Sequence, residues 1–294
     1  MDSLTFHRHY SKETSKRESL YPLFESVFGI PADELQDFHA RGFWDPTYRP
    51  YTFFDGEGAV ANASMFTLKL QMDGARVEAA GIQSVMTHPE YRKRGLMRQL
   101  LSQMLADIDR EYPAAWLFTE TPELYTPFGF RMVPQYAYVA EYSHSGSSDG
   151  GLRPIHLREE RDVQLVRDCF QNHEPISRVF APVGYESSFF LHMYSPSFER
   201  LVHYSERVQA ILVYAVEDQT LHLYDIIGKQ IPPLFEVGAA IPEPFTKWVL
   251  HFPPDRFPEL PFEPIVHDSD GKLMVRGPVG HERNALRMPK TAVF

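Results

Sequence analysis

A cluster of positive charge lies at the expected start of a helix. Four cations fall within seven residues, around one glycine and with no acid among them: Arg92, Lys93, Arg94, Gly95 and Arg98. The far end of the helix carries acids, so both ends are charged against the helix dipole. A bound polyanion would reverse that cost, because free N–H groups beside a glycine form an anion site. The alternative is a solvated basic turn before an ordinary core helix.

The residues around this cluster indicate the elements that must position it. Residues 51–55, 60–72, 77–87 and 131–142 have the pattern of strands, and residues 114–120 form a short apolar run typical of a buried strand. Behind the glycine, apolar side chains recur every three to four residues, which predicts an amphipathic helix that Pro113 ends. Its apolar positions are Leu96, Met97, Leu100, Leu101, Met104, Leu105 and Ile108. A strand therefore delivers the chain to the cluster, and the helix continues from it.

The pattern Arg92-x-x-Gly95-x-Met97, after a strand and at the start of a helix, resembles the acetyl-CoA signature Q/R-x-x-G-x-G/A of Gcn5-related N-acetyltransferases (GNAT). The sequence departs from it at Met97, where the family prefers a small residue. The resemblance implies that the basic turn cradles the pyrophosphate of CoA and that the preceding strand pairs with the pantetheine arm. The implied cofactor-binding residues are Val85, Met86, Thr87, Arg92, Lys93, Arg94, Gly95, Leu96, Met97 and Arg98.

A second motif, Tyr-x-x-Phe-Gly-Phe, begins at Tyr125. The resemblance implies that this tyrosine protonates the departing CoA thiolate. A phenol of pKa about 10 and a thiol of pKa about 8.5 are close enough for proton transfer. The alternative is a core tyrosine before a turn glycine.

A base is also needed, because an ammonium must lose a proton before it attacks. Glu120 is favoured over Glu123 and over His88, for which we expect a structural role. In the enhanced-intracellular-survival (Eis) branch of the family, the C-terminal carboxylate returns to the active site, which makes Phe294 a second candidate. A water held by these carboxylates is the third. Glu120 could equally be a solvated loop carboxylate, and Phe294 a packed or frayed tail.

The second half of the sequence echoes the first. Residues 114–120 and 247–252 occupy matching places as short buried strands. The whole pattern is similar to the Eis branch, whose members have two fused acetyltransferase lobes. The resemblance implies an α/β GNAT fold with a mixed sheet, duplicated as two tandem lobes. We expect a catalytic domain at 1–142, a Gly/Ser-rich linker at 143–151, and a degenerate second lobe at 152–294 that lacks a basic turn and does not bind CoA.

Composition excludes several classes of protein. The 294 residues carry a formal net charge of −10, which argues against general nucleic-acid binding. No apolar run approaches the roughly 18 residues of a membrane span, and the first residues lack the apolar core of a secretory signal. Cys169 is the single cysteine, which excludes an internal disulfide and fits the cytoplasm. No set of ligating residues completes a metal site, so we expect no metal.

The sequence thus predicts an N-acetyltransferase that uses acetyl-CoA as co-substrate. The acetyl group would pass to a primary amine of a small molecule by direct attack in a ternary complex. Acid-rich surroundings favour a cationic acceptor, and a homo-oligomer is possible. The alternative is a non-catalytic binding module that responds to acyl-CoA.

Overall fold

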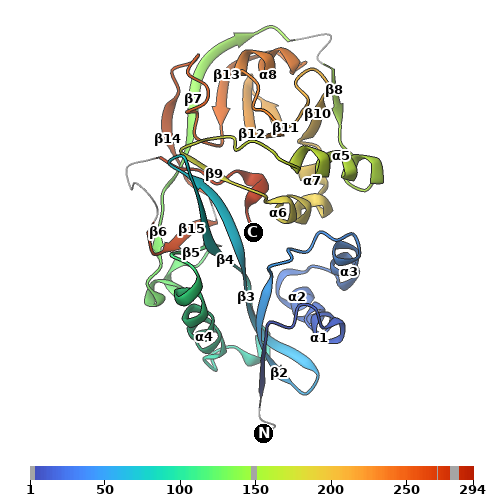
Figure 1. Cartoon of the computed structure of the whole chain (residues 1–294), viewed down its shortest axis with the longest axis vertical. Coiled ribbons are helices and arrows are strands. Elements are labelled where there is room, and N and C mark those ends of the chain that lie inside the picture. Colours follow the sequence, from blue (N-terminus) through green and yellow to red (C-terminus); the bar gives the residue numbers. More distant parts are fainter. Residues whose placement is uncertain (1–3, 147–150, 270, 279–284) are drawn as a thin grey trace.

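The computed structural model describes residues 4–146, 151–269, 271–278 and 285–294, which form two lobes, each built on a mixed sheet (Figure 1). The first sheet has the order β1-β2-β3-β4-β5-β15-β6, with β9 beside β3, and the second has the order β14-β7-β13-β12-β11-β10-β8. The strands of the first sheet are β1 Thr5–Arg8, β2 Arg49–Asp55, β3 Gly58–Met72, β4 Ala75–Thr87, β5 Ala115–Thr119, β6 Arg131–Met132, β9 Phe180–Pro182 and β15 Lys272–Arg276. Those of the second sheet are β7 Gln135–His144, β8 Leu152–Pro154, β10 Val202–Ser205, β11 Ala210–Glu217, β12 Thr220–Gly228, β13 Phe245–Leu250 and β14 Glu263–His267.

The helices divide between the lobes. The first lobe contains α1 Thr14–Glu18, α2 Tyr21–Phe28, α3 Ala32–Ala40 and α4 Leu96–Glu111. The second contains α5 Glu160–Phe170, α6 Glu186–Leu191, α7 Pro196–Glu199 and α8 Leu234–Ala240. Short 3₁₀ turns are η1 Pro89–Tyr91, η2 Pro122–Leu124, η3 Thr126–Phe128, η4 His192–Tyr194 and η5 Lys290–Ala292.

Both sheets follow one plan, but they exchange a strand. Each runs through antiparallel strands into one parallel pair, β4 with β5 and β12 with β13, which confirms that the two short buried strands occupy matching places. The strand beyond each pair comes from the other half of the chain. β15 lies antiparallel to β5, and β7 lies antiparallel to β13 (Figure 1). The expected division at 143–151, of which residues 147–150 lie outside the described residues, therefore does not separate the two sheets.

The sequence pattern misses two features of the first lobe. Residues 131–142 are expected to form one strand, and this prediction is wrong, because β6 belongs to the first sheet and β7 to the second. Pro134 lies between them, and its missing N–H and fixed φ interrupt a ladder. Helix α3 is not anticipated. It starts directly after Pro31, with Asp33 and Glu34 in its first turn, where the helix dipole favours acids.

The predicted amphipathic helix is confirmed as α4. Its buried apolar residues are Leu96, Leu100, Leu101, Met104, Leu105 and Ile108, and they pack on the first sheet. At the corresponding place in the second lobe, α8 has only seven residues and follows Pro233. Among the described residues, no helix combines the length and the apolar character that a membrane span requires.

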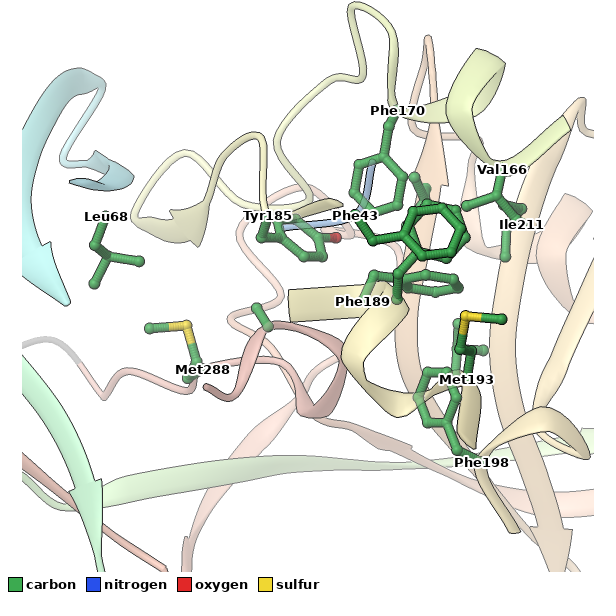
Figure 2. Close-up of a cluster of buried hydrophobic side chains, with 14 of the residues drawn as sticks. Phe43, Leu68, Val166, Phe170, Tyr185, Phe189, Met193, Phe198, Ile211 and Met288 are labelled. Atoms are coloured by element: carbon green, nitrogen blue, oxygen red, sulfur yellow. The ribbon is translucent and has the colours of Figure 1, made fainter. Parts of the chain in front are cut away.

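One hydrophobic core joins the lobes. Phe43 of the first lobe stacks on Phe190 of α6, with ring centroids 3.9 Å apart. Within the first sheet, Trp116 of β5 stacks on Phe180 of β9 at 5.6 Å and belongs to the same core. Figure 2 shows Phe43 among Phe170, Phe189 and Ile211 of the second lobe. Because interiors are close-packed, this shared core fixes how α6 faces the first lobe.

Candidate active site

A cavity of about 1060 Å³ opens between the start of α4, the ends of β4 and β5, helices α2 and α3, and α6 of the second lobe. It brings together almost every residue that the sequence analysis singled out. The residues of that set in its lining are Val85, Met86, Thr87, Arg92, Lys93, Gly95, Leu96, Met97, Arg98, Glu120, Tyr125 and Phe294. Arg94 is not in the lining. Its guanidinium donates to the Glu90 carbonyl at 3.0 Å and lies 4.6 Å from the centre of the Tyr91 ring.

The first structural feature of the cavity is a fork between two parallel strands. β4 and β5 pair from Ala80 opposite Ala115 to Ile82 opposite Leu117, and the pairing stops there. β4 continues to Thr87 along the cavity, still paired with β3 on one side but without β5 on the other. Its unpaired backbone groups form an open edge, to which an extended ligand with amide groups can add like a strand.

A β-bulge in β4 sets the direction of this open edge. Asn62 pairs with Met86 and Ser64 with Gln83, so Ser84 and Val85 fill a space that one residue of β3 spans. Ser84 has φ of 54°, which is uncommon for a residue other than glycine. The side-chain amide of Asn62 donates to the Ser84 carbonyl at 2.8 Å and so holds the bulge in place.

The bulge is supported by a buried polar network in β2 and β3. Thr52 donates to the side-chain oxygen of Asn62 at 2.7 Å and also forms a hydrogen bond with the hydroxyl of Tyr10. Asn62 donates to Ser64 at 2.9 Å, and Ser64 donates to the hydroxyl of Tyr48 at 2.6 Å. Thr52, Asn62 and Ser64 are fully buried, and buried polar groups with all partners made rigidify a core. Sequence reasoning missed this network, which no local motif marks.

Gly81 lets an aromatic ring reach the cavity. A Cβ atom at this position would lie 2.4 Å from the ring of Phe66, which is closer than real contacts allow. Phe66 lines the cavity from β3. The small residue just before the fork is therefore explained by the close approach of this ring.

The start of α4 has the features of an anion site. Gly95 precedes the helix with φ of 76°, and nothing lies within 4 Å of where its Cβ would be. Gln99 N–H closes the first turn on the Gly95 carbonyl at 3.2 Å. The N–H groups of Leu96, Met97 and Arg98 precede this bond and have no acceptor within the helix. Such a helix start favours an anion through both its N–H groups and its dipole.

The cations around this helix start are exposed and available. Arg92, Lys93 and Arg98 form no ion pair with any residue that the structure describes. The Arg92 Nε donates to the Thr87 carbonyl at 3.2 Å, which fixes the side chain beside the end of β4. Met97, the departure from the family pattern, packs partly on the hydrophobic core beneath α4. Its bulk is thus accommodated by the core.

Tyr125 lies between two single turns of 3₁₀ helix. Its N–H donates to the Pro122 carbonyl at 3.0 Å, and its own carbonyl accepts from Phe128 N–H at 2.9 Å. The side chain is buried against Phe130, with ring centroids 6.1 Å apart. Burial raises the pKa of Tyr125 to about 12, although a hydrogen bond with Thr119 acts in the opposite direction. The phenol therefore stays protonated at neutral pH, and the difference between its pKa and the thiol pKa of about 8.5 is larger than the sequence analysis assumed.

Phe294 reaches the same cavity from the other end of the sequence. Its ring meets Phe66 edge-on at 4.8 Å and Phe118 at 5.6 Å between centroids. In Figure 1 the end of the chain lies between the two lobes. Thr291 and Tyr185 both donate to the buried carboxylate of Asp225 in β12, the latter at 2.6 Å, so the second lobe anchors the segment that carries Phe294.

The carboxylates of the cavity are few. Glu120 follows β5 and is exposed, and Asp45 lines the cavity from the loop after α3. Glu123 and His88 are not in the lining. Among the described residues, no three histidine, cysteine or carboxylate side chains are grouped so that they could hold a metal ion.

Sequence reasoning also missed the apolar wall opposite α4. It consists of residues on α2, on α3 and after it, and on α6: Phe24, Val27, Phe28, Ile30, Leu35, Phe38, Trp44 and Leu191. The part of this wall on α2 could have been found in the sequence. Residues 21–30 contain more apolar side chains than one buried face of a helix needs. The contribution of α6 has no such signal, because it depends on the packing of the lobes.

Comparisons with known proteins agree with this geometry. Residues 10–133 match the model of the acetyltransferase (GNAT) domain family. No curated protein sequence is significantly similar to the chain.

Several solved structures share the fold over both lobes. Eis1 from Mycobacterium abscessus superposes with a TM-score of 0.59 at 14% identity, covering 94% of this chain and 73% of its own. A probable N-acyltransferase from Enterococcus faecalis V583, described as a conserved protein of unknown function, gives 0.57 at 14% identity, over 93% of this chain and 72% of its own. A GCN5-related N-acetyltransferase from Kribbella flavida gives 0.52 at 17% identity, over 93% and 71%.

At these identities the superpositions show the fold, and they confirm the predicted α/β arrangement of two GNAT-like lobes. The motif at the start of α4 lies inside the matched segment, as does Tyr125. Residues 10–133 therefore form a domain that matches the GNAT acetyltransferase family.

Proposed function

We propose that the protein transfers an acetyl group from acetyl-CoA to the primary amine of a small molecule. One observation carries the proposal: a single cavity contains the open edge of β4, the basic glycine-led start of α4, and the buried phenol of Tyr125. The first two match the amide-containing arm and the pyrophosphate of CoA. The third supplies a proton at the end of the arm, where the thioester would lie.

The proposed reaction needs no covalent enzyme intermediate. The amine nitrogen attacks the thioester carbon, the C–S bond breaks, and the thiolate takes the proton of Tyr125. A base removes the proton from the ammonium before attack, and the phenolate regains a proton afterwards from the new amide nitrogen through water. Holding both substrates in one cavity supplies much of the rate.

The base is proposed to be Glu120, the carboxylate of Phe294, or a water between them. Both residues line the cavity together with Tyr125. Glu120 is exposed and can exchange protons with solvent between turnovers.

The test is release of CoA from acetyl-CoA, followed with a thiol reagent over a panel of primary amines. Amine-dependent release, with mass spectrometry of an acetylated amine, is the expected result. Tight binding of acetyl-CoA without release for any amine would instead favour the non-catalytic module.

A further inference from the structure

The charges of the cavity are unevenly distributed. Its three lining cations, Arg92, Lys93 and Arg98, lie in the turn before α4 and in its first turn. The opposite wall, on α2, α3 and α6, carries none. Among the described residues, the side-chain carboxylates in the lining are Asp45 and Glu120, and the terminal carboxylate of Phe294 is a third. The acidity of the whole chain is therefore not concentrated at this site.

The wall opposite α4 is apolar and aromatic. Phe24 and Val27 come from α2, Phe38 from α3, and Trp44 from the loop that follows. Trp44 packs edge-on against Phe38 and Tyr48, with centroids 5.9 and 5.3 Å apart. Such a wall can bury the surface of an apolar ligand. A polycation would lose hydration there without gaining hydrogen bonds or ion pairs in return.

Three large apolar side chains at this cavity remain exposed to solvent. Phe28 is 50% exposed, Leu124 is 48% exposed and Leu191 is 38% exposed, and they belong to α2, η2 and α6 respectively. Their convergence from separate elements on one cavity is the feature that marks a ligand-binding groove. Leu191 comes from the second lobe, so both lobes contribute to this apolar rim.

The polar groups on this side are few, which suits a ligand with one polar head. The Oδ1 of Asp45 accepts from the N–H and hydroxyl of Thr47, at 2.7 and 2.6 Å. The Nε1 of Trp44 is buried and has no hydrogen-bond partner within the described residues. This side of the cavity therefore has few groups that could pair with the several ammonium groups of a polycation.

We propose that the acceptor is an amphipathic amine, with one primary ammonium on an aromatic or branched apolar body, such as an arylalkylamine. This inference rests on the proposed acetyl transfer and narrows its substrate. The apolar body would lie on the wall formed by α2, α3 and α6, and the amine would point toward Tyr125. The sequence analysis expected a cationic acceptor, and the local composition of the cavity narrows this expectation to a monocation with an apolar body.

The experiment compares kcat/KM for tryptamine, 2-phenylethylamine, ethanolamine, spermidine and an aminoglycoside, at one salt concentration. Tryptamine and 2-phenylethylamine should exceed spermidine and the aminoglycoside by about tenfold or more, as expected for burial of an aromatic body. Turnover that favours spermidine or the aminoglycoside would overturn this inference and leave the acetyl transfer intact.

Variants of the apolar wall test whether it causes the preference for aromatic amines. Phe28→Asn and Leu191→Asn should each lower the ratio of kcat/KM for tryptamine to that for ethanolamine by about fivefold, with unchanged affinity for CoA. Phe235→Asn is the control, because Phe235 is 59% exposed on α8 and lies outside the cavity. An equal ratio in all three variants and the native protein would overturn the inference.

If no amine releases CoA, the proposed acetyl transfer fails, and binding still tests the apolar site. Calorimetry of tryptamine with the CoA-loaded protein should then show saturable binding that Phe28→Asn weakens and Phe235→Asn does not. Absence of binding, or equal binding to all three proteins, would overturn the inference.

Discussion

The side-chain amide of Asn62 donates a hydrogen bond of 2.8 Å to the backbone carbonyl of Ser84, across the bulge that opens β4 to the cavity. Asn62 is fully buried, and its side-chain oxygen accepts from Thr52 at the same time. Asn62→Ala should therefore lower the free energy of unfolding by about 1–3 kcal/mol, because it leaves buried polar groups unpaired. It should also raise the KM for acetyl-CoA by about tenfold, since misplacement of a binding strand is costly.

A stability-matched control separates these two effects. Leu70→Val shortens another fully buried side chain of β3, away from the bulge. It should reduce stability in urea unfolding without changing the KM for acetyl-CoA. If both variants change KM equally, the bulge has no special part in CoA binding.

Replacement of Tyr125 tests the acid. Tyr125→Phe should lower kcat by about 10²–10⁴-fold while the affinity for acetyl-CoA stays near the native value. Because burial raises the pKa of Tyr125 to about 12, the phenol stays protonated, and the native kcat should show no descending limb from this group below pH 10. Tyr136→Phe, in the second sheet, is the control. Native turnover by Tyr125→Phe at every pH would exclude the assigned role.

The motifs that predicted the site are local in sequence, and this explains how much could be anticipated. The glycine before α4 and the cations around it act through the turn and the helix start that they themselves form. The placement of Tyr125 near them follows from the fixed path of β5 between the two motifs. Local sequence therefore indicated both the basic helix start and Tyr125, which line one cavity.

The parts that could not be anticipated depend on distant pairing. β7 and β15 are strands of ordinary composition, and nothing within either indicates which sheet it joins. The bulge at Ser84 needs a buried partner 22 residues away, and the apolar rim at Leu191 needs α6 to pack against the other lobe. Such features arise from tertiary context, which overrides local propensity.

Charge reversal tests the anion site at the start of α4. Arg92→Glu combined with Lys93→Glu should raise the Kd for CoA by about tenfold or more, and the salt dependence of binding should weaken. Arg200→Glu is the control, since Arg200 is exposed in the second lobe and forms no ion pair with a described residue. Equal affinities for the two variants would mean that the cations form only a solvated turn.

The identity of the base can be tested with two neighbouring glutamates. Glu120→Gln should lower kcat at neutral pH by about 10²-fold or more if Glu120 takes the ammonium proton. Glu123→Gln is the matched control, because Glu123 is exposed nearby but does not line the cavity. If Glu120→Gln retains native kcat, addition of one glycine after Phe294, which displaces its carboxylate but keeps its ring, should lower kcat instead.

Asp225 gives a prediction about pH. It is fully buried, and burial raises its pKa to about 6, despite hydrogen bonds from Thr291, Tyr185 and the Ile226 N–H. The folded protein therefore holds a proton that the unfolded chain releases near pH 4. Stability from this group is complete below about pH 4 and is lost as the pH rises through 6, with a slope of at most about 1.4 kcal/mol per pH unit.

Asp225→Asn removes this titration. As the pH rises from 4 to 7, the free energy of unfolding of the native protein should thus fall relative to that of Asp225→Asn. Asp168→Asn, which changes an exposed carboxyl of α5, should keep the native slope. Urea unfolding at several pH values measures these slopes. A constant difference between Asp225→Asn and the native protein would mean that Asp225 is ionised throughout this range, and that its hydrogen bonds outweigh the cost of burying its charge.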